Sequence, residues 1–160
     1  MMEVVAERIP PFERFYLEHR DEVLGYLRRL LGGRAEDAWQ ETFLRALRAY
    51  GGLRHGRHLR AWVFTIATNV ALDELRADAR DGHGGEPPDQ AVELRRDAFR
   101  ELEHLTGELP PTERAAVVLR YGYDLSYDTI GGALGSNEQA ARAAASSGVR
   151  RLRRKHAGLA

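Results

Sequence analysis

Two segments of the sequence carry polar side chains at helical spacing in patterns that suit the recognition of nucleic acid. In the first, Thr65, Thr68, Asn69, Leu72 and Arg76 occupy positions i, i+3, i+4, i+7 and i+11, which places them on one side of a helix. Their hydroxyl, amide and guanidinium groups supply donors and acceptors for base edges and one cation for phosphate. A solvated helix face has the same spacing, so the pattern leaves both interpretations open.

The second segment lies near the C-terminus and has the pattern of a helix-turn-helix. Ser126 is placed to cap a short helix, Gly135 supplies a turn, and Ser136 with Gln139 has capping-box spacing for the next helix. The basic run RRLRRK near the end of that helix would neutralise phosphates and give salt-sensitive binding. A helical hairpin whose cationic end satisfies the helix dipole is the alternative. The outer stripe of the last helix consists of Arg142, Ser146, Arg150 and Arg153.

Other reactive patterns are weak. His55 and His58 lie in the Gly/Arg-rich run GGLRHGRH with no third ligand in view, so we expect no metal site there. The chain has no Cys, which excludes disulfides, zinc–thiolate sites and thiol catalysis. No nucleophile, base and orienting group can be assembled from the spacing, and no glycine-rich phosphate loop follows a strand. We therefore predict a protein without enzymatic activity, cofactor or metal.

Charge is balanced overall and uneven along the chain. The 160 residues include 24 basic and 24 acidic side chains, for a net charge of zero. Residues 1–80 hold 13 basic and 12 acidic side chains, residues 81–108 hold three and eight, and residues 109–160 hold eight and four. An acidic middle therefore separates a near-neutral segment from a basic one. No apolar run reaches the roughly 20 residues of a membrane span, and no apolar signal core is present, so we expect a cytoplasmic protein.

Apolar residues recur at helical spacing along most of the chain, and strand signals are poor. We expect helices near residues 11–31, 35–50, 58–78, 90–106, 111–121, 126–134 and 137–155, with the Gly pairs at 32–33 and 51–52 ending the first two. The run DGHGGEPPDQ (81–90) is typical of a flexible link. The sequence therefore predicts an all-α fold of two small helical domains, residues 1–78 and 91–160, joined by a linker at 79–90.

Four of these helices have inward apolar stripes, and that of helix 11–31 is Phe12, Phe15, Tyr16, Val23, Leu27, Leu30 and Leu31. The stripe is Trp39, Phe43, Ala46, Leu47 and Tyr50 in helix 35–50, Leu59, Trp62, Val63, Ile66 and Val70 in helix 58–78, and Ala141, Ala145, Val149 and Leu152 in helix 137–155. The outward side of helix 35–50 carries Asp37, Gln40, Glu41, Leu44 and Arg48. Leu44 is apolar among polar neighbours, which indicates either a partner surface or packing on a nearby loop.

Three runs in this order, AEDAWQETFLRALRAY, HLRAWVFTIATNVALDELR and LPPTERAAVVLRYGYDLSYDTIGGALG, closely resemble bacterial sigma factors of the sigma-70 family. The match is to the extracytoplasmic-function group, which retains only regions two and four, and it covers residues of about 10–78 and 91–155. The resemblance implies a region-two helical bundle, a region-four helix-turn-helix and a protein that directs RNA polymerase to promoters.

The resemblance also implies where polymerase binds. In the family, the pattern D-x-x-Q-E-T-F-L-R-A docks on the clamp helices of the polymerase β′ subunit. The expected polymerase contacts are Asp37, Gln40, Glu41, Phe43, Leu44, Arg45 and Arg48.

A second family pattern, W-x-x-x-I-A-x-N-x-x-x-D-x-x-R, opens the −10 element and captures a flipped non-template base in a pocket. Asn69 can supply both a donor and an acceptor to a base edge. The expected −10 contacts are Trp62, Thr65, Ile66, Thr68, Asn69, Asp73 and Arg76.

The helix-turn-helix resembles the family's reader of the −35 element, which also sits on the polymerase β flap. The expected −35 contacts are Ser126, Tyr127, Glu138, Gln139, Arg142, Ser146, Arg150 and Arg153. Here the sequence departs from the family, because Ala144 and Ser147 stand where relatives are usually basic, and Arg142 alone keeps a cation at the start of the helix. Ala offers no hydrogen bonds to bases, and Gly148 costs about 1 kcal/mol of helix stability relative to Ala. We therefore expect a degenerate −35 recognition helix.

Three interpretations follow from this departure. The protein is a sigma factor that relies on the −10 element, or one that needs an accessory transcription activator, or a sigma-like adaptor that binds polymerase or another regulator without initiating transcription itself. The expected partners are core RNA polymerase, promoter DNA and, as for many members of the group, an anti-sigma factor.

Overall fold

The computed structural model describes residues 8–81 and 106–156, and all regular structure within them is helical. The N-terminal part consists of α2 (Phe12–Leu31), the short 3₁₀ helix η1 (Gly32–Arg34), α3 (Ala35–Tyr50) and α4 (Leu59–Asp81). The C-terminal part consists of α6 (Pro111–Val117), the π-helical segment η3 (Val118–Gly122), α7 (Tyr127–Ala133) and α8 (Glu138–His156). The predicted all-α fold is confirmed. The expected helix at 90–106 and most of the expected linker lie outside the described residues.

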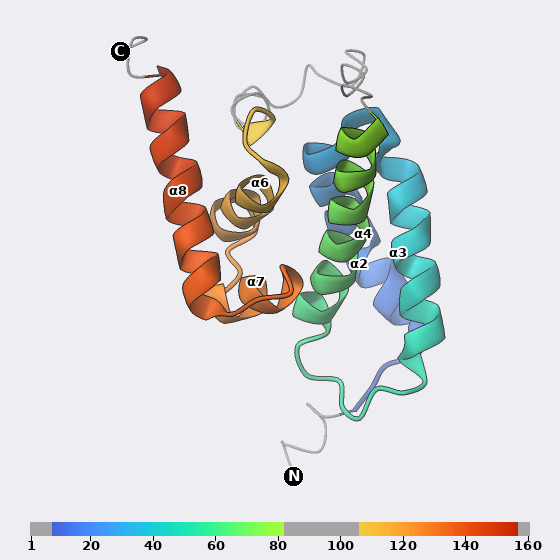
Figure 1. Ribbon diagram of the computed structural model, residues 1–160. Helices are drawn as coiled ribbons and strands as arrows, with labels where there is room; N and C mark the ends of the chain where they lie inside the picture. The colour runs from blue at the N-terminus through green and yellow to red at the C-terminus, as the bar shows by residue number, and fades with distance from the viewer. Residues whose placement is uncertain (1–7, 82–105, 157–160) are drawn as a thin grey trace.

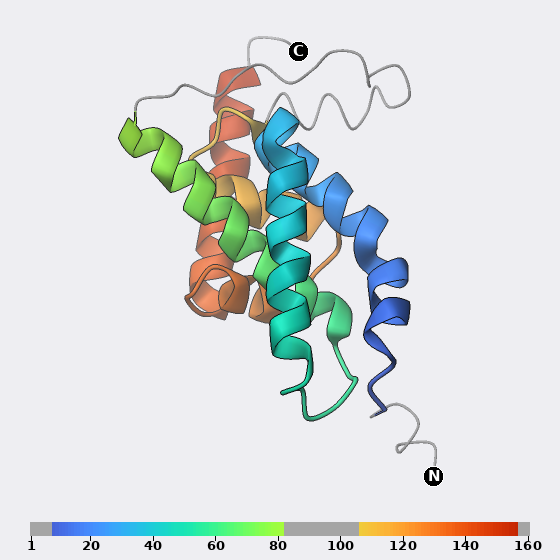
Figure 2. The ribbon, with the colours of Figure 1, turned by 90° about the vertical axis from the view of Figure 1, so that its right-hand side faces the viewer.

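Helices α2, α3 and α4 pack side by side as a bundle, which Figures 1 and 2 show from two directions. Aromatic rings fill its centre, with the Phe15 ring within 6.2 Å of the rings of Phe43, Tyr50 and Trp62. Burial of such rings removes much apolar surface from water, and this is the main force holding the helices together. The aromatic residues predicted to face inward therefore form the core of this bundle.

The bundle's connections follow from its glycines and from one ion-pair network. α2 ends at Gly32, whose φ of 60° is a left-handed conformation that glycine adopts without strain. α3 begins after Arg34, which bonds to Glu74 at 2.9 Å and also to Asp78, both on α4. These bonds hold the last turns of α4, which runs three residues past the predicted end at 78, against the α2–α3 connection.

The C-terminal helices form the predicted helix-turn-helix. The Ser126 hydroxyl accepts a hydrogen bond from the Thr129 backbone amide at 3.2 Å and so caps α7, as predicted. The turn needs glycine twice, because Gly135 has a φ of 71° and a Cβ on Gly131 would lie 2.4 Å from the Asn137 carbonyl carbon. The capping residue of α8 was predicted wrongly, since the Asn137 side chain, and not Ser136, accepts from the Ala140 amide at 2.9 Å.

The two helical parts share one core. α4 contacts both α6 and α7, and Figure 1 shows α7 lying against the beginning of α4. The buried cluster includes Phe64 and Ala67 of α4 together with Leu119, Tyr123 and Ile130 of the C-terminal part. The sequence predicted two domains, and in this structure the two helical parts are in contact with each other.

Candidate nucleic-acid and polymerase interfaces

α4 presents a polar edge to solvent along its second half. The side chains of Asn69, Asp73 and Arg76 are exposed there, at the spacing of one helix face. Thr65 and Trp62, one and two turns earlier, are half-buried, and the Thr65 hydroxyl donates to the Ala61 carbonyl at 2.9 Å. Ile66 is also half-buried and packs on the core. An amide, a carboxylate and a guanidinium therefore form a continuous exposed row.

The prediction that Thr68 and Leu72 face outward is wrong in this structure. Both are buried, and the Thr68 hydroxyl lies 2.7 Å from the Tyr26 hydroxyl and 2.7 Å from the Phe64 carbonyl oxygen. Burial raises the pKa of Tyr26, which keeps its phenol protonated, and the bond to Thr68 opposes that rise. The reason is that α4 packs against α2 and α3 and also against α6 and α7 of the C-terminal part, so a second stripe of the helix is also inside.

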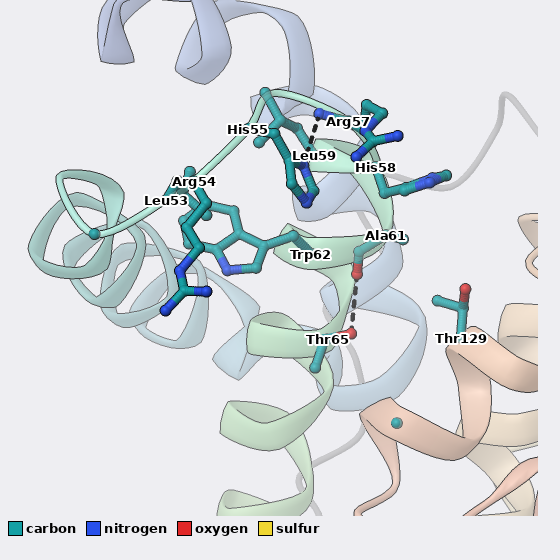
Figure 3. A pocket seen from close by; sticks show the side chains of 12 residues that line it. Leu53, Arg54, His55, Arg57, His58, Leu59, Ala61, Trp62, Thr65 and Thr129 are labelled. Carbon is teal, nitrogen blue, oxygen red and sulfur yellow. Dashed lines mark hydrogen bonds between the residues drawn. The ribbon is translucent and has the colours of Figure 1, made fainter. Parts of the chain in front are cut away.

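An open pocket of about 530 Å³ adjoins the first turns of α4 (Figure 3). One wall is the α3–α4 loop, residues 51–58, a second is α4 itself, and α7 contributes Thr129 and Gly132. The loop brings Arg54, His55, Arg57 and His58 to the pocket, and Trp62 and Thr65 line it from α4. Cationic and ring side chains beside hydroxyl groups suit a planar, anionic ligand such as a nucleotide.

The sequence did not indicate that this loop lines a pocket with α4 and α7. Its two histidines were weighed only as metal ligands, and no group of three metal-binding side chains exists among the residues that the structure describes. The available signal was the density of cations: GGLRHGRH holds two Arg and two His directly before the helix assigned to DNA. Within the loop, the Arg57 backbone amide donates to His55 Nδ1 at 3.3 Å.

The outer face of α3 combines charge with exposed apolar surface. Asp37, Gln40 and Arg48 are exposed, and Glu41 and Arg45 pair at 2.9 Å along the helix. Leu44 is 47% exposed and Leu47, which was predicted to face inward, is 52% exposed. Phe43 is buried beneath this face, against Tyr16 and Trp39. Leu44 and Leu47, one turn apart, form a small exposed apolar patch on this helix.

The outer face of α7 and α8 is basic and partly engaged internally. Seven of the eight predicted −35 residues are exposed, and Tyr127 is half-buried. The Tyr127 ring lies between the guanidinium groups of Arg120 and Arg142, whose Cζ atoms are 4.5 and 4.6 Å from its centroid. Arg142 also donates to Glu138 at 2.7 Å. The exposed set is Ser126, Glu138, Gln139, Arg142, Ser146, Arg150 and Arg153.

Comparison with known proteins places this geometry in a family. Residues 15–81 match the family model for sigma-70 region 2, and residues 99–152 match that for sigma-70 region 4. The RNA polymerase sigma factor CarQ of Myxococcus xanthus is 34% identical over 89% of this chain and 87% of its own length. The chain belongs to the sigma-70 family, in its extracytoplasmic-function group. Sigma factors are non-catalytic subunits of RNA polymerase that direct transcription initiation.

A further relative and a solved structure are also similar to this chain. The extracytoplasmic-function sigma factor BldN of Streptomyces coelicolor is 32% identical over 96% of this chain and 65% of its own length. Among solved structures, the sigma factor RpoE of Bartonella quintana, in complex with the anti-sigma factor NepR, covers 89% of this chain with a TM-score of 0.71 and 22% identity. The second likeness supports the fold.

In this sigma factor, helices α2 to α4 belong to region 2 and helices α6 to α8 belong to region 4. RNA polymerase and promoter DNA are partners that the family implies. Within the described residues, no helix is both long and apolar enough to cross a bilayer.

Proposed function

We propose that this sigma factor binds the clamp helices of polymerase β′ through α3 and opens the −10 element through α4 and the α3–α4 loop. The observation that carries the proposal is the meeting of the exposed Asn69–Arg76 edge of α4 with the basic pocket at its N-terminal end. A flipped base entering the pocket would meet Trp62 and Thr65, while its phosphates would meet the loop cations.

For polymerase binding, the supporting feature is the leucine pair on α3. Leu44 and Leu47 would be buried by a partner helix, and Glu41 and Arg45 would flank the contact with charges. Such an apolar centre with a charged rim is the usual make-up of a protein–protein interface.

For the −35 element, we propose that region 4 binds DNA with little base-specific readout. The first two turns of α8 offer Ala143 and Ala144, and the Ser147 hydroxyl is already bonded to Glu113 at 2.7 Å. Arg142 is drawn toward Glu138 and Tyr127. The other two cations of the outer stripe, Arg150 and Arg153, are suited to phosphate contacts, which add affinity without reading sequence. The β flap of polymerase would hold region 4 near the DNA.

A second candidate function rests on the same shortage of DNA-binding side chains in the first turns of α8. If region 4 supplies too few DNA contacts, initiation needs an accessory activator, or the protein acts as an adaptor on polymerase. We also propose an anti-sigma factor as a regulatory partner. It would cover exposed surfaces such as Leu44 and Leu47.

The test is transcription in vitro with purified core polymerase on a promoter library, comparing the wild-type chain with two variants. Asn69→Ala is expected to reduce open-complex formation while leaving co-purification with core intact. Leu44→Glu is expected to weaken core binding, because it places a charge in an apolar contact. Leu17→Glu is its matched control, since Leu17 is 54% exposed on α2. Full activity of both variants would overturn the proposal, and activity only with added factors would favour the activator-dependent candidate.

A further inference from the structure

The segment before α2 lies against the loop that forms one wall of the pocket. Residues 8–11, which we call the N-terminal strap, precede residues 15–81 that match the family model for region 2, and they pass beside the α3–α4 loop (Figure 1). At Gly56, in the middle of that loop, an added Cβ would lie 2.2 Å from the Arg8 carbonyl oxygen and 3.2 Å from the Ile9 Cα. The two main chains are therefore in direct contact, and glycine alone leaves room for it.

The strap is stiff and is anchored to the core of region 2. The ring of each of its two prolines, Pro10 and Pro11, restricts φ to about −65°. Pro11 has φ −56° and ψ 147°, an extended polyproline conformation. The hydroxyl of Tyr50, the last residue of α3, donates to the Pro10 carbonyl oxygen, and the Phe12 ring meets the Tyr50 ring edge-on with centroids 5.2 Å apart. Tyr50 thus fixes the strap at the place where the loop begins.

The same tyrosine connects the strap to the pocket. The Tyr50 ring centroid is 6.2 Å from that of Trp62, which lines the pocket from α4. Backbone bonds fix the two ends of the loop: the Gly52 amide donates to the Ala49 carbonyl at 3.0 Å, and the Trp62 amide donates to the His58 carbonyl at 2.9 Å. The strap meets the loop between these ends, so it supports the part that turn bonds and helix bonds do not reach.

The loop holds a conformation that benefits from outside support. His58 has a φ of 62°, in the left-handed region that disfavours a residue with a side chain. Arg54 and Arg57 are both exposed cations in this short loop, and like charges repel. A loop that is ordered before its ligand arrives does not lose conformational freedom on binding. Contact with the strap therefore favours binding at the pocket.

We propose that the N-terminal strap positions the base pocket, with Gly56 and Tyr50 as its positioning residues. The strap holds the α3–α4 loop at the distance from Trp62 at which the pocket admits a flipped base, while the loop cations meet its phosphates. The proposal rests on the proposed function for the ligand, single-stranded promoter DNA, and on the contacts of the strap for the position of the loop. Neither residue touches DNA, because each acts through the loop.

Positioning of this kind affects which DNA is bound more than how much is bound. Discrimination between bases needs donors and acceptors held within about 0.5 Å of their working positions. Attraction of phosphates to the loop cations depends much less on exact placement and carries no sequence information. A loop released from the strap therefore keeps its attraction for DNA and loses its preference between bases.

The first experiment measures the order of the loop by hydrogen exchange of the amides in residues 51–58. Gly56→Ala places a methyl group against main-chain atoms, which no side-chain rotation relieves, and Tyr50→Phe removes the bond to Pro10 while keeping the ring. Gly51→Ala is the matched control, since Gly51 begins the same loop and a Cβ there meets no atom within 4 Å.

Exchange in the loop is expected to be at least about tenfold faster in Gly56→Ala and about 2- to 10-fold faster in Tyr50→Phe, with no change in Gly51→Ala. Rates equal to the wild type in both strap variants would show that the strap does not hold the loop, and would overturn the proposal.

The second experiment measures base selection. Each chain is assembled with core polymerase and incubated with a pool of random single-stranded DNA, and the bound strands are counted and sequenced. The wild type is expected to select particular bases. Gly56→Ala should reduce this preference by at least about fivefold while binding a similar amount of DNA, Tyr50→Phe should reduce it less, and Gly51→Ala should keep it. Less DNA bound with an unchanged base preference would indicate a merely structural role and overturn the proposal.

The outcomes separate the strap from the proposed function. If the wild-type holoenzyme selects no base, the proposed function fails and a positioned base pocket fails with it, whereas the exchange rates still show whether the strap holds the loop. If the wild type and both strap variants select bases equally well, the proposed function stands and the positioning role is overturned. Thermal unfolding of each variant checks the fold, and Tyr50→Phe decides the matter if Gly56→Ala does not fold.

Discussion

Gly148 shows how one residue acquires a meaning that its propensity does not give. In the middle of α8 it weakens the helix by about 1 kcal/mol relative to Ala. The structure places it against α6, where a Cβ would lie 2.6 Å from the Val117 Cγ2 and 3.4 Å from the Leu109 Cδ1. The missing side chain therefore allows α6 and α8 to approach closely. The glycine that looked like a defect of the recognition helix is a packing residue.

We expect Gly148→Ala to destabilise the chain by about 1–3 kcal/mol, because overpacking outweighs the gain in helix propensity. Gly132→Ala is the matched control, since a Cβ there meets no atom within 4 Å. It should be neutral or stabilise by up to about 1 kcal/mol. Urea unfolding followed by circular dichroism measures both. A Gly148→Ala chain as stable as the wild type would contradict the packing role.

His19 gives the fold a dependence on pH. It is buried on α2, its ring 5.1 Å from that of Phe15. Burial lowers the pKa of His19 below its ordinary value of 6.5, Arg60 acts in the same direction, and Glu18 and Glu22 oppose the shift. The folded chain thus keeps His19 neutral at a pH where the unfolded chain binds a proton. The contribution of His19 to the free energy of unfolding is therefore fully present above about pH 6.5 and is lost as the pH falls below that value.

The corresponding prediction concerns the slope of unfolding free energy against pH. Between about pH 5 and 7 the wild-type slope should include a positive contribution from His19 of at most about 1.4 kcal/mol per pH unit. His19→Gln should lose that contribution. His55→Gln, in the exposed α3–α4 loop, is the control and should keep it. Identical slopes in all three chains would exclude His19 as the source.

At the residue scale, sequence periodicity predicted most of the buried apolar residues. It was less able to predict which side of each helix faces solvent. Phe43, Val63 and Ala145 are buried as expected, whereas Leu47 is exposed and Thr68 is buried. The apolar stripe shows which residues share one face of a helix. Whether a face is buried depends on the other parts of the chain that pack against it. Thr68 is inside because other helices cover α4, and its hydroxyl is paired there with that of Tyr26, 42 residues earlier.

At the scale of elements, α8 is a helix several of whose polar and charged side chains are bonded within the protein. Glu113 of α6 bonds Ser147 at 2.7 Å and pairs with Arg151 at 2.8 Å. Glu138 pairs with Arg142 at 2.7 Å at the end of the helix that would enter the groove. The Glu138 carboxylate would repel DNA phosphates, and it also pairs with Arg142, the only cation in the first two turns of α8. The low affinity expected of this helix therefore has two causes, missing cations and a retained acid.

We expect Glu138→Gln to tighten binding of a −35 duplex several-fold and Arg142→Ala to weaken it only slightly, with a salt slope lower by at most about 0.9. Fluorescence anisotropy of the duplex over a range of salt concentrations measures both. Glu36→Gln, an exposed acid on α3, controls for net charge. A large, sequence-specific loss with Arg142→Ala would show that the helix still reads bases.

Most helices could be predicted because their signals are local. The Gly stops, the Ser126 cap and the apolar stripes placed α2, α3 and α7 within a residue or two. The π-helical η3 could not be predicted, since a π segment has no sequence signature separate from an α-helix. The basic pocket was also missed, because it forms only where the α3–α4 loop, α4 and α7 converge.

At the scale of the whole molecule, two small helical units support each other. Units of this size bury a limited core on their own. Here the cluster of buried residues continues from Phe64 of region 2 through Tyr123 to Ile130 of region 4. The sequence predicted two domains and could not predict their contact, since a linker composition says nothing about which faces meet. The shared core follows from Tyr123, an aromatic residue between η3 and α7 for which the sequence predicted no role.

A shared core has a thermodynamic consequence that calorimetry can detect. The free chain is expected to unfold in a single transition, with equal calorimetric and van't Hoff enthalpies, because region 4 cannot leave without exposing Phe64 and Tyr26. Arg29→Ala removes the bond to the Tyr123 hydroxyl, which weakens the contact, and should lower the van't Hoff enthalpy relative to the calorimetric one as the regions begin to melt separately. Arg28→Ala should retain the single transition. Two well-separated transitions in the wild-type chain would mean that regions 2 and 4 fold independently, and the stability of each would then rest on its own helices.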